Sequence, residues 1–155
     1  MSPHVTYMGF AEGAMFDARG HLALVGFSPQ AHVADTFPTT VAPSLIMLVD
    51  DAEEASVLVP GGAATVRVVV TNDDGEVVFY VEQAAQIGGP KDASGLPGRF
   101  SLVAQFPVTA AKAGQFRYSV TLTFPGGEQV QQEARLRVVD QAWLDERKAQ
   151  RSHAP

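Results

Sequence analysis

Residues 114–139 constrain the fold of this chain more than any other stretch of the sequence. From Phe116 to Phe124 every second residue is apolar, and after a break at 125–127 the alternation returns up to Val138. A period of two gives an extended strand one dry and one wet face, and turn-forming residues between two such runs indicate a β-hairpin. This stretch therefore predicts two antiparallel strands whose apolar sides lie on one core.

Further strands are predicted before this hairpin, at 5–16, 21–27, 45–50, 65–71, 76–83 and 100–106, with a short edge segment at 57–59. The first strand is expected to bend or bulge at Gly9 or Gly13. Residues 21–27 and 45–50 are apolar on both sides, a pattern typical of strands covered on both faces. We therefore expect both of them to be central strands.

Turn-forming residues separate these strands. Asn72-Asp73-Asp74-Gly75 is a strong hairpin signal, and 17–20 predicts another turn. The proline-containing stretch 28–43 and the glycine-rich stretch 88–98 are expected to be a connection and a surface loop, and 107–113 to cross over into the central hairpin.

The composition limits the class of protein. The chain has 155 residues, the size of one domain, and no cysteine, which excludes disulfides and thiolate metal sites. The N-terminus lacks the features of a secretory signal, and no apolar run is long enough to cross a membrane. We expect a cytoplasmic protein, or one exported without a cleavable N-terminal signal. The net charge of −6 argues against nucleic-acid binding.

The spacing of strands and turns is typical of a sandwich or barrel. In 112–118, a small-residue turn precedes Phe116-x-Tyr118, and this segment resembles the entry into the penultimate strand of immunoglobulin-like sandwiches. We predict an all-β fold, a single immunoglobulin-like antiparallel β-sandwich of about 7–9 strands over 1–139. A short C-terminal helix or tail follows over 140–155. Asp140 is expected to cap a helix that ends near residue 150, leaving 151–155 frayed.

The N-terminal third carries a more particular pattern. An apolar strand is followed by Asp17-x-x-Gly20-His21-Leu22-x-Leu24-Val25-Gly26-Phe27, then by Phe37-Pro38 and an apolar strand that ends in Val49. This pattern resembles a group of small, uncharacterised bacterial proteins catalogued as a domain of unknown function. The resemblance covers most of residues 5–139. It implies an immunoglobulin-like sandwich and brings no established activity or catalytic residue. The extension from Asp140 departs from the shared pattern.

The titratable residues show no metal-site spacing. The histidines, His4, His21, His32 and His153, form no helix pair and no finger-like set. We interpret them as surface or turn residues, with a metal or catalytic site where His21 and His32 approach each other as the alternative. The acidic group Asp50, Asp51, Glu53 and Glu54 lacks the spacing of a calcium loop, and we interpret it as a solvated strand end. The same interpretation applies to Asp73 and Asp74.

Catalytic motifs are absent from the sequence. Residues 88–91 combine glycine with lysine but lack the order of a phosphate loop. There is no nucleophile elbow, and no carboxylate pair can be singled out. We therefore predict no catalytic, metal-binding or cofactor-binding residue, no cofactor, and no enzymatic activity.

Two groups of residues are candidates for binding a partner. Trp143, the only tryptophan, lies beside Leu144, and Arg147 follows in a charged segment. Tryptophan and arginine are enriched among the residues that dominate binding energy at interfaces. The alternative is that Trp143 folds back and caps the sandwich core.

The second group is the wet face of the hairpin, which carries Arg117, Arg135 and Arg137. This positive patch could meet an acidic partner, although arginines beside Glu133 are also ordinary soluble strand residues.

These observations predict a non-enzymatic protein-interaction module that docks a partner or itself through a sheet edge, the C-terminal segment or the loop at 88–98. One alternative is a structural accessory subunit of a larger assembly, such as a phage-like or secretion particle. Another is a carbohydrate or small-ligand binder that uses the loops at one end of the sandwich. Neither nucleic acid nor membrane is expected as a partner.

Overall fold

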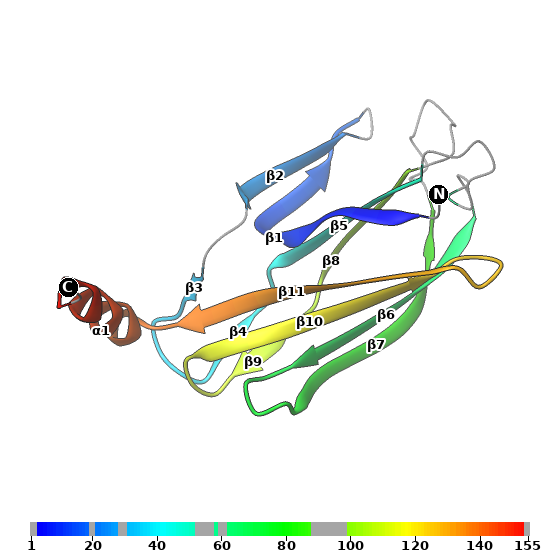
Figure 1. Ribbon diagram of the computed structural model, residues 1–155. Helices are drawn as coiled ribbons and strands as arrows, with labels where there is room; N and C mark the ends of the chain where they lie inside the picture. The colour runs from blue at the N-terminus through cyan, green and yellow to red at the C-terminus, as the bar shows by residue number, and fades with distance from the viewer. Residues whose placement is uncertain are drawn as a thin grey trace.

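Two β-sheets face each other and enclose one core, as the computed structural model shows for residues 3–18, 21–27, 31–51, 58, 62–87 and 99–153 (Figure 1). One sheet has the order β2 (Leu22–Phe27), β1 (His4–Phe16), β5 (Ser44–Asp50), β8 (Arg99–Gln105). The other has the order β3 (His32–Val33), β11 (Gln129–Val139), β10 (Gly114–Thr123), β6 (Ala63–Thr71), β7 (Val77–Gln86). Two short strands, β4 (Thr39–Val41) and β9 (Val108–Ala110), pair with each other.

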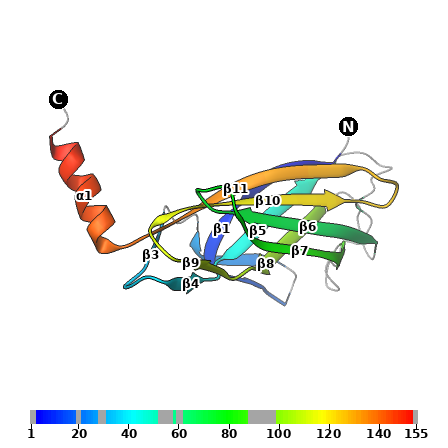
Figure 2. The same ribbon diagram turned by 90° about the horizontal axis from the view of Figure 1, so that it is seen from below.

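The all-β sandwich prediction is confirmed. Neighbouring strands in the described residues pair antiparallel, except for β3, which runs parallel to β11. Eight of the described strands have six or more residues, within the predicted range. Seen from below, the two sheets lie one over the other (Figure 2).

The predicted central hairpin is β10 with β11. Phe116 lies opposite Leu136 and Tyr118 opposite Ala134, so the apolar positions of the two strands share the core face. The chain reverses at Gly126 and Gly127, whose φ angles of 95° and 92° suit glycine. The alternation read from the sequence therefore predicts both strands and the face that each turns to the core, and the pairing register comes from the structure.

Aromatic side chains join the two sheets across the core. The ring of Phe10 from β1 stands edge-on to that of Tyr118 from β10, with centroids 4.9 Å apart. Phe100 of β8 meets Phe124, which follows β10, in the same geometry at 6.3 Å. Edge-to-face pairs of this kind contribute about 0.5–1.5 kcal/mol beyond the burial of their surface. They fix how the two layers sit on each other.

Of the two strands expected to be central, only one is. β5 lies between β1 and β8, and Leu45, Ile46 and Met47 are fully buried, as predicted. β2 is an edge strand, and Val25 is 64% exposed, so the prediction for 21–27 is wrong. The reason is that β1 pairs with β5 only up to Ala11 and with β2 only from Ala11 onward.

β1 was predicted to bend or bulge at Gly9 or Gly13. The strand changes its pairing partner at Ala11, between these two glycines. The register irregularity towards β5 lies earlier, between Val5 and Tyr7. As a result, β2 and the second half of β1 rise away from the five-stranded sheet (Figure 1).

The predicted C-terminal helix is α1 (Gln141–Ser152). The Asp140 side chain accepts a hydrogen bond from the Trp143 backbone N–H at 2.9 Å, which confirms the expected N-cap. Arg151 and Ser152 belong to the helix, so the expectation that fraying starts at Arg151 is wrong. The helix contains no buried residue and extends away from the sandwich (Figure 2). Trp143 therefore does not cap the core, and that interpretation is wrong.

Two connections contain pairing that the sequence did not predict. Stretch 28–43 holds β3 and β4, and stretch 107–113 holds β9. The Thr40 and Thr109 hydroxyls lie 3.0 Å apart across the β4–β9 pair. Strands of two or three residues are too short to show an alternation of apolar and polar residues. The prolines in these stretches therefore led to the prediction of loops. The predicted loop at 88–98 and both ends of the predicted segment 57–59 lie outside the described residues.

Candidate functional site

One corner of the sandwich gathers segments that are far apart in the sequence. The β6–β7 turn, the β9–β10 turn, the end of β11 and the start of α1 meet there around two neighbouring surface hollows of about 200 and 230 Å³. Asp73, Ala113, Gly114 and Gln115 line both hollows. The corner is therefore one continuous surface built from two turns, a strand end and a helix start.

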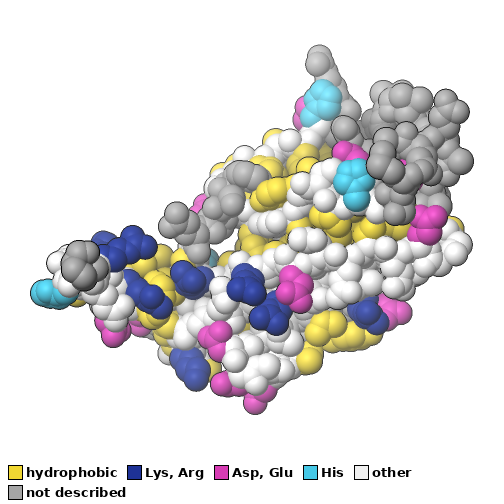
Figure 3. Space-filling model, in the orientation of Figure 1, with side chains coloured by type: hydrophobic (Ala, Val, Ile, Leu, Met, Phe, Trp, Pro, Cys, Tyr) yellow, Lys and Arg dark blue, Asp and Glu magenta, His cyan; other side chains and the backbone are white. Residues whose placement is uncertain are grey.

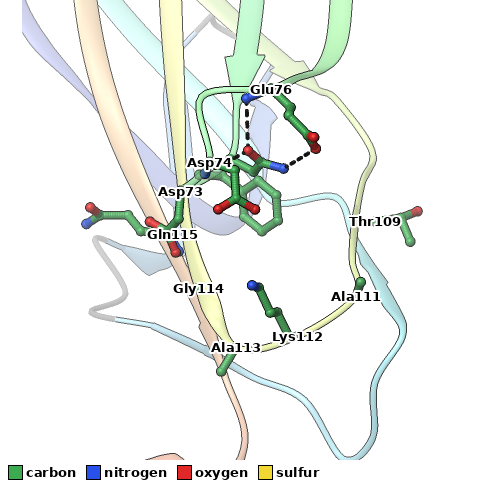
Figure 4. Close-up of a pocket in the computed structure, with 11 residues that line it drawn as sticks. Asp73, Asp74, Glu76, Thr109, Ala111, Lys112, Ala113, Gly114 and Gln115 are labelled. Carbon is green, nitrogen blue, oxygen red and sulfur yellow. Dashed lines mark hydrogen bonds between the residues drawn. The ribbon is translucent and has the colours of Figure 1, made fainter.

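The β6–β7 turn is held by its own first residue. The Asn72 side-chain oxygen accepts hydrogen bonds from the backbone N–H groups of Asp74 and Glu76, both at 3.0 Å. Its amide donates to the Glu76 carboxylate at 3.1 Å (Figure 4). Gly75 supplies the positive φ of 78° that the reversal needs. This confirms the predicted hairpin and fixes where its acidic side chains lie.

Asp73 ties this turn to the start of β10. Its Oδ2 accepts a hydrogen bond from the Gln115 backbone N–H at 3.0 Å, across 42 residues of sequence. A Cβ on Gly114 would lie 2.6 Å from the same oxygen, so a larger residue at position 114 would push the Asp73 carboxylate out of this position. The first hollow thus has Asp73, Asp74 and Glu76 on one side, and the Lys112 amine points into it (Figure 4).

The second hollow is built around Trp143. The Arg137 guanidinium carbon lies 5.4 Å from the centroid of the indole ring, and that of Arg147 lies 4.8 Å from it. Arg147 is one helical turn after Trp143, whereas Arg137 comes from β11. Both distances are within the range of a cation–π contact. Within the described part of the chain, neither guanidinium lies within 4.0 Å of a carboxylate oxygen.

The two remaining arginines of the hairpin extend this surface along the sheet. Arg117 lies directly opposite Arg135 in the β10–β11 register, and its Nε is 3.7 Å from a Glu133 carboxylate oxygen. Like charges directly opposite each other on a sheet are destabilising. Figure 3 shows dark blue side chains gathered over α1 and the neighbouring part of the hairpin. We call Arg117, Arg135, Arg137, Trp143 and Arg147 the basic corner.

The structure brings most of the predicted site residues together. Trp143, Arg137 and Arg147 are in contact, and Arg135 and Arg117 follow on the outer face of the same hairpin. Leu144 is half-buried beside Trp143 on α1 and takes no part in the ring contacts. Sequence reasoning interpreted Asp73 only as a solvated turn residue and assigned no site role to Lys112, because the meeting point of their two turns depends on the fold.

The other candidate residues form no comparable group. His21 pairs with Asp17 in the β1–β2 turn, where Nδ1 and Oδ2 are 3.4 Å apart. Among the residues that the structure describes, no three His, Cys, Asp or Glu side chains are placed to hold a metal ion. Asp51 is only 7% exposed, so the solvated interpretation of the acidic group is wrong there, because the residue continues directly from buried β5. Glu53, Glu54 and residues 88–91 lie outside the described residues.

Comparison with solved structures finds 14 similar chains, one of which is described below. No protein-family model matches the chain, and no curated protein sequence matches it. The crystal structure of Northeast Structural Genomics Consortium target SoR45 aligns with 88% of this chain and 87% of its own, at 12% identity and a TM-score of 0.43. In the described part of the chain, no helix has the length and apolar character needed to cross a bilayer. The fold assignment therefore depends on the strand pairing of the chain itself.

Proposed function

We propose that this chain is a non-enzymatic interaction module that binds an acidic segment of a partner protein at the basic corner. The proposal depends on one observation: Arg137 and Arg147 both stack on the half-buried ring of Trp143. In the described residues neither arginine has a carboxylate partner. A guanidinium that lies over an indole keeps its N–H edge free to bind a carboxylate with two hydrogen bonds. Stacking also restricts the arginine side chains before a partner arrives, which lowers the entropy cost of binding.

The distribution of charge supports an acidic protein segment. The basic corner, with Lys148 and Arg151 on the same helix, holds six of the eleven Lys and Arg residues in a chain of net charge −6. A local positive surface attracts a short acidic segment, whereas the net negative charge repels a long polyanion such as nucleic acid. The half-buried indole adds apolar area of the kind found at the centre of binding sites.

The order of strands supports an immunoglobulin-like arrangement for the sandwich. In immunoglobulin-like domains, strands A, B and E form one sheet and strands G, F, C and C′ form the other. Here β1, β5 and β8 would take the places of the first group, and β11, β10, β6 and β7 those of the second. Such sandwiches commonly bind through loops and sheet edges at one end, where the basic corner lies. We also propose a cytoplasmic location, which the absence of cysteine suits.

The fluorescence of Trp143 tests the proposal directly, because the chain has no other tryptophan. We expect a hexaglutamate peptide to change this fluorescence saturably, and added salt to weaken the binding. The double variant Arg137→Gln, Arg147→Gln should bind the peptide at least about tenfold more weakly, as expected for loss of charge-assisted hydrogen bonds.

A matched control is Arg67→Gln, which removes an exposed arginine from the outer face of the same sheet and should leave the affinity unchanged. Truncation of residues 141–155 should abolish binding while the thermal midpoint of the sandwich stays within about 2 °C, because α1 buries no residue. Absence of a saturable change, or equal binding by the double variant, would contradict the proposal.

A further inference from the structure

β2 and the second half of β1 form a two-stranded ribbon at one edge of the four-stranded sheet. The pairs run from Ala11 opposite Phe27 to Phe16 opposite Leu22, whereas β5 pairs with β1 no further than Ala11. From Gly13 onward the ribbon therefore has no third strand on either side among the described residues. We call residues 11–16 and 22–27 the apolar ribbon.

The apolar ribbon has the composition of a buried element. Its twelve residues include one charged side chain, Glu12, and neither proline nor lysine. Met15 is 66% exposed, Phe16 52% and Val25 64%. A two-stranded hairpin is at best marginally stable alone in water, and exposed edges are usually protected by charges, proline or a cover. In the described chain the only charge here is that of Glu12, whose side chain lies over Gly26 near the end of β2. The rest of the β2 edge has no charge, no proline and no covering strand.

The outer edge of β2 also offers backbone groups for pairing. The Asp17 backbone N–H donates to the His21 carbonyl at 2.8 Å, which sets the alternation of bonded and non-bonded pairs along the ribbon. Met15 with Ala23, and Gly13 with Val25, are then hydrogen-bonded pairs across the ribbon. Leu22 and Leu24 lie in the non-bonded pairs, so their N–H and C=O groups point away from β1. No strand of the described chain pairs with them.

We propose that this edge binds the same edge of a second copy of the chain. Two β2 strands related by a two-fold axis run antiparallel, so Leu22 of each copy can exchange both backbone hydrogen bonds with Leu24 of the other. The two four-stranded sheets then become one continuous sheet. β2 is apolar on both faces, which is typical of a strand inside a sheet. In the dimer β2 would be an interior strand, between β1 of its own copy and β2 of the other.

The residues of β2 leave a second copy free to approach along this edge. β2 carries no charged side chain, so two molecules of net charge −6 meet along a neutral strip. An acidic or basic partner would gain no charge complement at this strip. The open edge is also complementary to itself, because the same two residues supply its donors and acceptors.

Sedimentation velocity over a concentration series tests the proposal. Wild type should shift from monomer to dimer as concentration rises. Val25→Lys puts a charge on an exposed face of the edge and should weaken dimerisation at least about tenfold, whereas Val25→Thr, which keeps a β-branched side chain, should preserve it. Leu24→Pro removes an outward N–H without touching the β1–β2 bonds, and it should also prevent dimerisation.

Circular dichroism of each variant establishes that the sandwich is folded. A wild type that stays monomeric up to its solubility limit would overturn the proposal, and so would a dimer that survives both Val25→Lys and Leu24→Pro. Binding of hexaglutamate at the basic corner should be the same in all three variants, which keeps this test separate from that of the proposed function.

Discussion

Gly114 shows how one side chain is excluded by a tertiary contact. Its backbone conformation is open to other residues, since its φ is not in the left-handed region, but the Asp73 carboxylate occupies the space where a Cβ would lie. The same carboxylate holds the Gln115 N–H. The preference for glycine therefore comes from a turn 41 positions earlier in the sequence.

We predict that Gly114→Ala destabilises the protein by about 1 kcal/mol, because the added Cβ moves the Asp73 carboxylate away from the Gln115 N–H. Asp73→Ala alone should cost about 1 kcal/mol through loss of one hydrogen bond. The double variant should be no less stable than Asp73→Ala, because the clash has gone. Urea denaturation measures all three. Gly13→Ala is the control, since its Cβ would meet Val25 at an ordinary 3.9 Å. Additive losses in the double variant would contradict the prediction.

Tyr118 places a phenol hydroxyl in the core. The side chain is 1% exposed, and among the described residues the hydroxyl has no hydrogen-bond partner. Burial raises the pKa of Tyr118 well above its ordinary value, because the phenolate cannot be solvated there. An unsatisfied buried hydroxyl costs stability, whereas the ring itself packs against Phe10.

We predict that Tyr118→Phe stabilises the protein by about 1 kcal/mol near neutral pH. Above a pH of about 10 the unfolded chain loses the Tyr118 proton and the folded chain keeps it, so wild-type stability falls as pH rises. Tyr118→Phe should remove up to about 1.4 kcal/mol per pH unit of that fall. Tyr80→Phe, at an exposed position, is the control and should keep the alkaline loss of stability that is due to Tyr118. Identical alkaline profiles for wild type and Tyr118→Phe would refute this account.

At the scale of the elements, the stability of α1 depends more on capping at its ends than on packing of its faces against the sandwich. It has twelve residues and buries none, and helices shorter than about 12–15 residues are marginal in water without tertiary packing. Its described side-chain contacts are the Asp140 cap, the Gln141–Asp145 hydrogen bond, the hydrogen bond from the Ser152 hydroxyl to the Lys148 carbonyl, and the cation–π contacts of Trp143. The basic corner therefore depends on a helix that is easily unwound.

We predict that Asp140→Ala lowers the helicity of residues 141–152, since loss of an N-cap costs about 0.5–2 kcal/mol. The thermal midpoint of the sandwich should change by less than about 2 °C, because α1 buries no residue. Backbone chemical shifts measure the helicity, and Trp143 fluorescence reports its exposure. Asp140→Asn, an equally good cap, is the control. A helix that persists in Asp140→Ala would show that other contacts hold it.

At the scale of the whole molecule, the two candidate surfaces lie on different elements and differ in chemistry. The basic corner is positively charged and gathers around α1 and the hairpin, whereas the apolar ribbon carries a single charged residue, Glu12, and belongs to the opposite sheet. A module with both surfaces could pair with its own copy and still present two basic corners to acidic partners. Two linked sites would raise the overall affinity for a partner with two acidic segments.

The sequence determined the local structure of this protein. Alternation of apolar and polar residues predicted β10, β11 and their core faces, Asn72–Gly75 predicted a turn, and Asp140 predicted the start of α1. These features depend on neighbours within a few residues, so composition and period carry them.

The tertiary structure alone decided what lies beside what. An apolar pattern in 21–27 is the same whether a strand is central or at an edge, and only the change of partner at Ala11 placed β2 outside. The approach of Asp73 to Gly114 and of Arg137 to Trp143 likewise joins segments through folding of the whole chain. Contacts between distant residues depend on how the sheets pack, and no local period encodes that packing.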